Sequence, residues 1–166
     1  MAARLDTDHP GVRRVVAALA AAGLAGADAM RVLDDEVRTA AQAAAALGIP
    51  VGAIANSVVF DADSQPLLAL TSGAHRADTG LLATLAEVRH VGRAGPDFVR
   101  THTGQPIGGV APVGHPRPVR TFVDAALRNH TVVWASGGHP KVVFPTTFEE
   151  LVALTGGTVA ELAARP

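Results

Sequence analysis

The sequence predicts an α+β fold, in which helices pack outside a mixed and mostly antiparallel sheet. Strand-like and helix-like segments alternate irregularly along the chain, which is typical of a mixed sheet and not of a regular parallel one. Two apolar runs, at residues 53–60 and 66–70, flank the polar segment 61–65 and predict a β-hairpin. No G-x-G-x-x-G or phosphate-binding P-loop motif joins a strand to a helix, which disfavours a nucleotide-binding doubly wound sheet.

Length and composition predict one domain over residues 1–166, with a helical N-terminal extension to about residue 29 and a core from about 30 to 160. Hydrophobic residues make up 48% of the chain and aromatic ones 4%, so the core must be largely aliphatic. No cysteine is present, which excludes disulfides, thiolate zinc sites and cysteine nucleophiles.

The charge and hydropathy of the chain favour a soluble protein. Its formal net charge of −1 does not indicate a strongly cationic nucleic-acid binder. No apolar run is long enough to span a bilayer, and Met1–Asp8 lacks the pattern of a signal peptide. We therefore expect a cytoplasmic protein with no membrane partner.

Two helices are predicted in the first third of the chain. Apolar residues recur at helical spacing from Val12 to Leu19, with Pro10 near the start and Gly23 near the end. Residues 31–33 then predict a short strand.

The second helix begins with the capping-box pair Thr39 and Gln42 and runs to Leu47. Gly48 follows as a helix stop, and Pro50 prevents the helix from continuing.

The remaining elements follow from similar signals. Asp78 is typical of a helix N-cap, and Thr147 and Glu150 repeat the capping-box spacing before a last helix. Short strands are predicted at 88–91, 119–123, 131–135 and 141–144, and a short helix at 96–101 that ends by Gly104. Val159 is compatible with a last strand or with a terminal helix.

The segment 106–114 is the strongest candidate for function. It is rich in glycine and proline and carries no charge, so it predicts a stiff loop and not a helix or a central strand. Glycine lets a ligand come close to the exposed backbone of such a loop. The alternative is a tight connector between two strands.

Several polar residues are weaker candidates. Seven histidines are present, but none has recognised metal-ligand spacing, so we expect no metal and no cofactor. His139 lies in the segment 137–140, which predicts an accessible turn between two strands. Asp124 follows an apolar strand and is also suited to capping a short helix. Ser57 lacks the G-x-S-x-G elbow of a nucleophile.

Gly108–Pro112 matches the G-x-x-x-P loop of the YbaK/prolyl-tRNA-synthetase-associated editing-domain family. Other stretches resemble the family in the same order. They lie at residues 40–50, 54–60, 122–124, 133–134 and 150–156. The resemblance covers about residues 30 to 160.

The resemblance implies hydrolysis of the ester that joins a wrong amino acid to tRNA. It implies neither a metal nor a protein nucleophile, because a 2′-hydroxyl of the substrate helps to activate water. It assigns catalytic positions to Asn56, Gly108, Gly109 and His139, and substrate-binding positions to Ser57, Val110, Ala111, Pro112, Asp124 and Gly138. Backbone amides of Gly109, Val110 and Ala111 are then expected to act as an oxyanion hole.

One departure from the family leaves three functions open. Many members carry a lysine at the position of Asn56, and asparagine supplies no positive charge. We expect a free-standing aminoacyl-tRNA deacylase that recognises the acceptor end of tRNA. The alternatives are a non-catalytic module that binds tRNA or an aminoacyl-tRNA synthetase, and a small-molecule hydrolase with a histidine base.

Overall fold

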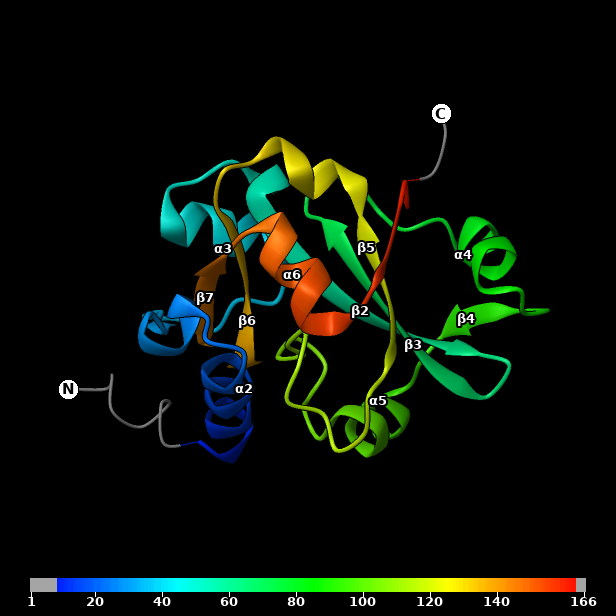
Figure 1. Cartoon of the computed structure of the whole chain (residues 1–166), viewed down its shortest axis with the longest axis horizontal. Coiled ribbons are helices and arrows are strands. Elements are labelled where there is room, and N and C mark those ends of the chain that lie inside the picture. The colour runs from blue at the N-terminus through cyan, green and yellow to red at the C-terminus, as the bar shows by residue number, and fades with distance from the viewer. Residues whose placement is uncertain (1–8, 164–166) are drawn as a thin grey trace.

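The computed structural model describes residues 9–163 as one mixed sheet flanked by helices (Figure 1). The sheet has eight strands in the order β1-β7-β6-β2-β3-β5-β8, and β4 pairs with β2 off this path. The strands are β1 (Arg31–Val32), β2 (Ile54–Ala62), β3 (Gln65–Ser72), β4 (Val91–Arg93), β5 (Arg120–Asp124), β6 (Val133–His139), β7 (Val142–Thr146) and β8 (Thr158–Ala160).

The α-helices of the described segment precede or connect these strands. They are α2 (Pro10–Ala21), α3 (Ala40–Leu47), α4 (Thr79–Ala86), α5 (Pro96–Thr103) and α6 (Phe148–Thr155). Short 3-10 helices η1 (Ala25–Asp28), η2 (Val51–Ala53) and η3 (Ala125–Asn129) complete the connections. None of the helices between residues 9 and 163 is long and apolar enough to cross a membrane.

Strand pairing confirms the predicted α+β class with a mixed sheet. Antiparallel partners are β2–β3, β2–β4, β6–β7 and β1–β7. Parallel partners are β2–β6, β3–β5 and β5–β8. The predicted hairpin is β2–β3, with Ala62 opposite Gln65 at its turn.

The core lies on both faces of the sheet because side chains alternate along each strand. Leu68 and Leu70 of β3 join a cluster with α2, α6 and residues Val110 and Ala111. Leu67 and Ala69 face the other way, into a second cluster with α4. Ala43 and Ala44 of α3 pack on Ile54 in a third. Figure 1 shows α2 beside β6 and α6 across the middle of the sheet.

The predicted helix caps are confirmed. The side chains of Thr39, Asp78 and Thr147 each accept a hydrogen bond from the backbone N–H three residues later, at 3.1 Å. Gly48 ends α3 with a left-handed φ of 68°, a conformation that favours glycine.

Two predicted boundaries were wrong. The strand expected at 88–91 is β4, which begins only at Val91, because the Val88 N–H still donates to Ala83 O and closes α4. His139 is the last residue of β6 and does not lie in the turn, which is formed by Pro140 and Lys141. Val159, whose sequence is compatible with a strand or a helix, lies in β8.

Candidate functional site

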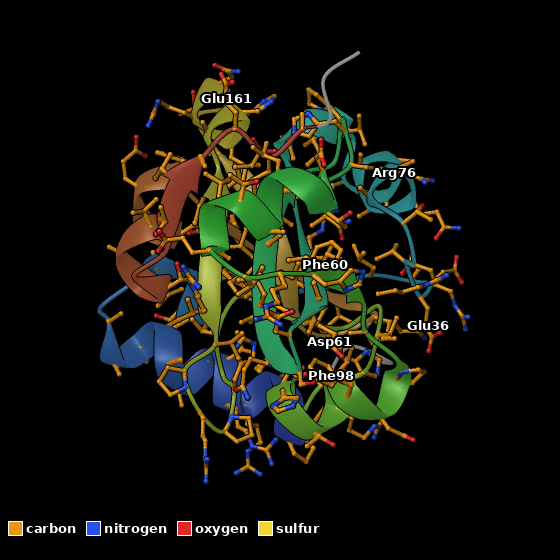
Figure 2. All side chains as sticks on the ribbon, turned by 90° about the vertical axis from the view of Figure 1, so that its right-hand side faces the viewer. Glu36, Phe60, Asp61, Arg76, Phe98 and Glu161 are labelled. Atoms are coloured by element: carbon orange, nitrogen blue, oxygen red, sulfur yellow. The ribbon has the colours of Figure 1, made fainter. Side chains whose placement is uncertain are left out.

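A cavity of about 500 Å³ lies beside β2 and is lined by several of the residues predicted from the sequence. Asn56, Ser57, Gly108, Val110 and His139 all line it. The cavity therefore brings together residues from β2, from the loop at 106–114 and from the end of β6. Glu36, which lies between β1 and α3, and Phe60, farther along β2, also line it and are labelled in Figure 2.

The cavity occupies a gap in the sheet. On one edge, β2 pairs with β6 only at Ile54 and Ala55 and with β4 only from Phe60 to Ala62. Among the described residues, no strand pairs with this edge at 56–59. Backbone groups on that edge are thus left for a ligand or for water.

The buried side chain of Gln105, which precedes the loop at 106–114, is hydrogen-bonded to the loop backbone. Its exposed fraction is only 1%. The Ala111 N–H donates to Gln105 Oε1 at 2.8 Å, and Gln105 Nε2 donates to Val113 O at 3.2 Å. No local signal in the sequence marked Gln105, because its importance lies in contacts that only the folded loop creates.

These bonds correct the expected oxyanion hole. The N–H of Ala111 is already used, and the N–H of Gly109 donates to Pro106 O at 2.9 Å. Within residues 9–163, the amides of Gly108 and Val110 donate to no protein acceptor. Both residues line the cavity. Among residues 108–111, the available backbone donors are therefore Gly108 and Val110.

Two adjacent glycines of the loop are required for different reasons. Gly108 has a φ of +87°, which L side chains rarely adopt, and it faces open space. Gly109 is buried against the end of β6, because a Cβ there would lie 2.9 Å from Pro140 Cδ and 3.1 Å from His139 Cα. Gly109 thus sets the distance between the loop and His139.

The His139 imidazole is oriented by its own turn. Its Nδ1 accepts a hydrogen bond from the Lys141 N–H at 3.0 Å. In the neutral ring the proton must then lie on Nε2, which becomes a hydrogen-bond donor. Neutral His139 can therefore donate to a ligand through Nε2, whereas its basic nitrogen is already occupied.

Asn56 and Ser57 differ in their surroundings. The Asn56 side chain is exposed, and its amide has no hydrogen-bond partner among the described residues. Ser57 Oγ is buried at the cavity and also lacks a partner within the described chain. Arg38 and Arg93 are the cationic side chains of the lining, and Arg38 lies 3.5 Å from Glu36.

Five predicted site residues do not line the cavity, and Gly109 is one of them. Ala111 and Pro112 are buried residues of the loop itself, and Gly138 packs against α2. Asp124 is buried at the end of β5, where it accepts hydrogen bonds from the N–H groups of Ser72 and Ala126, both at 3.0 Å, and contacts His75 Nε2. Its expected capping of the short helix after β5 is confirmed.

His115, which follows the loop at 106–114, is hydrogen-bonded to the loop backbone. Its Nε2 donates to Ala111 O at 2.8 Å. Burial lowers the pKa of His115 below its usual 6.5, and the bond to Ala111 opposes this effect in part. No cluster of three or more metal-ligating side chains occurs in the described part of the chain.

Comparison with known proteins places these residues in a family. A family model described as the aminoacyl-tRNA editing domain matches residues 34–154. The proline–tRNA ligase of Nitratidesulfovibrio vulgaris strain Hildenborough is 30% identical over 122 residues, which cover 74% of this chain and 20% of the ligase. The chain thus spans about a fifth of the length of this curated relative.

Solved structures extend the likeness to nearly the whole fold. A crystal structure described as a candidate trans-editing enzyme for prolyl tRNA synthetase is 40% identical, with a TM-score of 0.86, and the match covers 94% of this chain and 98% of that one. A scaffold protein from a study of epitope backbone grafting is 37% identical, with a TM-score of 0.87, over 95% of this chain and 99% of that one.

Proposed function

The chain belongs to the aminoacyl-tRNA editing domain family, and on this basis we propose that it is a free-standing aminoacyl-tRNA deacylase. Its substrate is the ester between a wrongly attached amino acid and the terminal ribose of a tRNA. A protein of this kind acts in the cytoplasm, where charged tRNAs are used. The curated relatives support a tRNA for proline as the first to test.

The observation that carries the proposal is the unused polar groups around one cavity. The amides of Gly108 and Val110 and the hydroxyl of Ser57 have no protein partner within the described chain, and all three residues line the cavity. Ser57 Oγ and Val110 are buried, whereas Gly108 is exposed. Buried polar groups without partners are uncommon in folded proteins, and a ligand that supplies the partners accounts for them.

The chemistry is the addition of water to the ester carbonyl. As the water oxygen bonds to the carbonyl carbon, negative charge develops on the carbonyl oxygen, and the free amides stabilise it. The bond from that carbon to the ribose oxygen then breaks, which releases the free amino acid and the ribose hydroxyl. A neighbouring ribose hydroxyl of the substrate takes the proton from the water and passes its own proton to the leaving ribose oxygen. His139 Nε2–H donates a hydrogen bond to the substrate.

The structure disfavours a small-molecule hydrolase in which His139 is the general base. That role requires a free ring nitrogen, but Nδ1 accepts the Lys141 N–H. A donor role at Nε2 agrees better with the observed geometry.

The test is single-turnover hydrolysis of a panel of tRNAs charged with Ala, Ser, Cys and Pro. We expect the protein to release at least one wrong amino acid from a tRNA for proline and to leave Pro attached. Rates at the uncatalysed level for every charged tRNA would contradict the deacylase. Activity that is lost with EDTA and restored by zinc would contradict the metal-free mechanism.

A non-catalytic module is the second candidate, and the exposed Asn56 favours it. The amide brings no positive charge to the cavity, and Arg38 and Arg93 lie at its lining as side chains of other segments. Binding of uncharged tRNA or of a prolyl-tRNA synthetase, without hydrolysis of any substrate in the panel, would support this candidate.

A further inference from the structure

We infer that His9, the N-cap residue of α2, is a positioning residue for the imidazole of His139. The centroids of the two rings lie 5.0 Å apart, and the ring planes meet at 67° in an edge-to-face contact. The inference rests on the proposed function, because His139 is the side chain that it concerns.

The backbone brings the two histidines together through a pair of glycines. A Cβ on Gly11 would lie 2.9 Å from Gly138 O, and a Cβ on Gly138 would lie 2.7 Å from Gly11 O. Real Cβ atoms essentially never show contacts under 3.0 Å. The start of α2 and the end of β6 therefore touch backbone to backbone, which only glycine at both positions permits.

Each ring is also fixed by its own backbone. His9 Nδ1 accepts from the Gly11 N–H at 3.1 Å, just as His139 Nδ1 accepts from the Lys141 N–H at 3.0 Å. One hydrogen bond leaves a ring free to turn about that contact. The His9 ring, packed at a steep angle against His139, removes this freedom and keeps Nε2 directed to one position.

The contact comes from outside the segment that defines the family. The family model matches residues 34–154, whereas His9 and Gly11 precede it. The N-terminal helix thus does more than cover the sheet, because its first residue contacts a side chain that lines the cavity.

Because His9 has two roles, capping α2 and contacting His139, two variants separate them. His9→Asn retains an N-cap acceptor but removes the ring, and His9→Phe retains a ring but removes the acceptor. Asp78→Ala is the matched control, because it removes the cap of α4, which is not part of the cavity. The measurements are the melting temperature and the single-turnover deacylation rate at saturating substrate.

We expect His9→Asn to slow the saturated rate about tenfold at an unchanged melting temperature, since small misplacements of reacting groups are costly. His9→Phe and Asp78→Ala should melt earlier but react at a rate within about twofold of the parent, because the geometry at His139 is kept. A rate that follows the melting temperature across the three variants would overturn the inference.

Nitrogen NMR of the His139 ring separates this inference from the proposed function. The parent should show one rigid ring with the proton on Nε2, and His9→Asn should show increased motion of the ring, because the Lys141 N–H bond alone leaves it free to turn. This result can be obtained even if no charged tRNA is hydrolysed. An unchanged His139 spectrum in His9→Asn would overturn the inference whatever the activity.

Discussion

Two polar clusters in this molecule differ in whether their hydrogen bonds are complete. At the end of β5, Asp124 is 1% exposed and is bonded to the N–H groups of Ser72 and Ala126 and to His75. At the cavity, Ser57 and Val110 keep polar groups without partners in the described chain. The first cluster stabilises the fold, and the second is available to a ligand.

The difference shows how to separate structural from functional polar residues in a small domain. Both clusters contain residues that the sequence assigned to the site. Only the number of unused donors and acceptors distinguishes them. Substitutions at the complete cluster should change stability, and those at the incomplete cluster should change activity.

The largest effect is expected for Gly109→Val. The added Cβ would lie 2.9 Å from Pro140 Cδ and 3.1 Å from His139 Cα, so the loop must move away from β6. We expect single-turnover deacylation to fall about a hundredfold while the circular dichroism spectrum is kept.

The matched control for this substitution is Gly95→Val. A Cβ at Gly95 meets nothing within 4 Å, and Gly95 does not line the cavity. Equal deacylation rates for the Gly109 variant and the parent would show that the loop is not part of the active site.

Asp124→Ala tests the complete cluster. It leaves the buried N–H of Ser72 and the partly buried N–H of Ala126 without an acceptor, so the free energy of unfolding should fall by about 3 kcal/mol. Urea unfolding measures this change, with Asp124→Asn as the milder control because one acceptor oxygen remains. If the variant is as stable as the parent but no longer binds substrate, Asp124 is a substrate-binding residue and not a structural one.

Asn56, which also lines the cavity, tests the cluster whose hydrogen bonds are incomplete. Its side chain is exposed and unpartnered in the described chain, so Asn56→Ala should change the free energy of unfolding by less than about 0.5 kcal/mol. If the amide binds substrate or water, deacylation should fall about tenfold in this variant, since one hydrogen bond is worth about 1 kcal/mol or more.

Asn56→Lys completes the comparison, and we expect it to be slower than the parent, because lysine accepts no hydrogen bond. A faster Asn56→Lys variant would instead mean that the cavity lacks a cation. Parent-level rates in Asn56→Ala would place the amide outside the site.

The smallest effect concerns pH. Burial lowers the pKa of His115, so the unfolded chain binds a proton at a higher pH than the folded chain does. Stability should therefore fall as the pH drops below about 6.5, the ordinary histidine value. Urea unfolding between pH 7.5 and 5.5 should show a shallower decline for His115→Gln than for the parent.

Local signals predicted much of the fold. The caps at Thr39, Asp78 and Thr147 were found because an N-cap depends on residues within one helical turn. Parallel pairing of β2 with β6 was not predicted, because it joins segments about 80 residues apart through a register that no local pattern encodes.

The site was predicted in part, for the same reason. The loop at 106–114 and His139 were identified from local composition and from the family resemblance. Which amides of that loop are free was predicted wrongly, because Gln105 and Pro106 use two of them only after the loop has closed. His9 was missed because its partner lies at the other end of the chain.

The buried Gln105 has a consequence for how a ligand would bind. With both ends of its amide bonded inside the loop, at Ala111 and Val113, the loop holds its shape before any ligand arrives. Its backbone entropy is lost during folding and need not be lost again on association. Encounter with a tRNA end should accordingly be a docking step without a loop-ordering phase, and association should follow a single exponential.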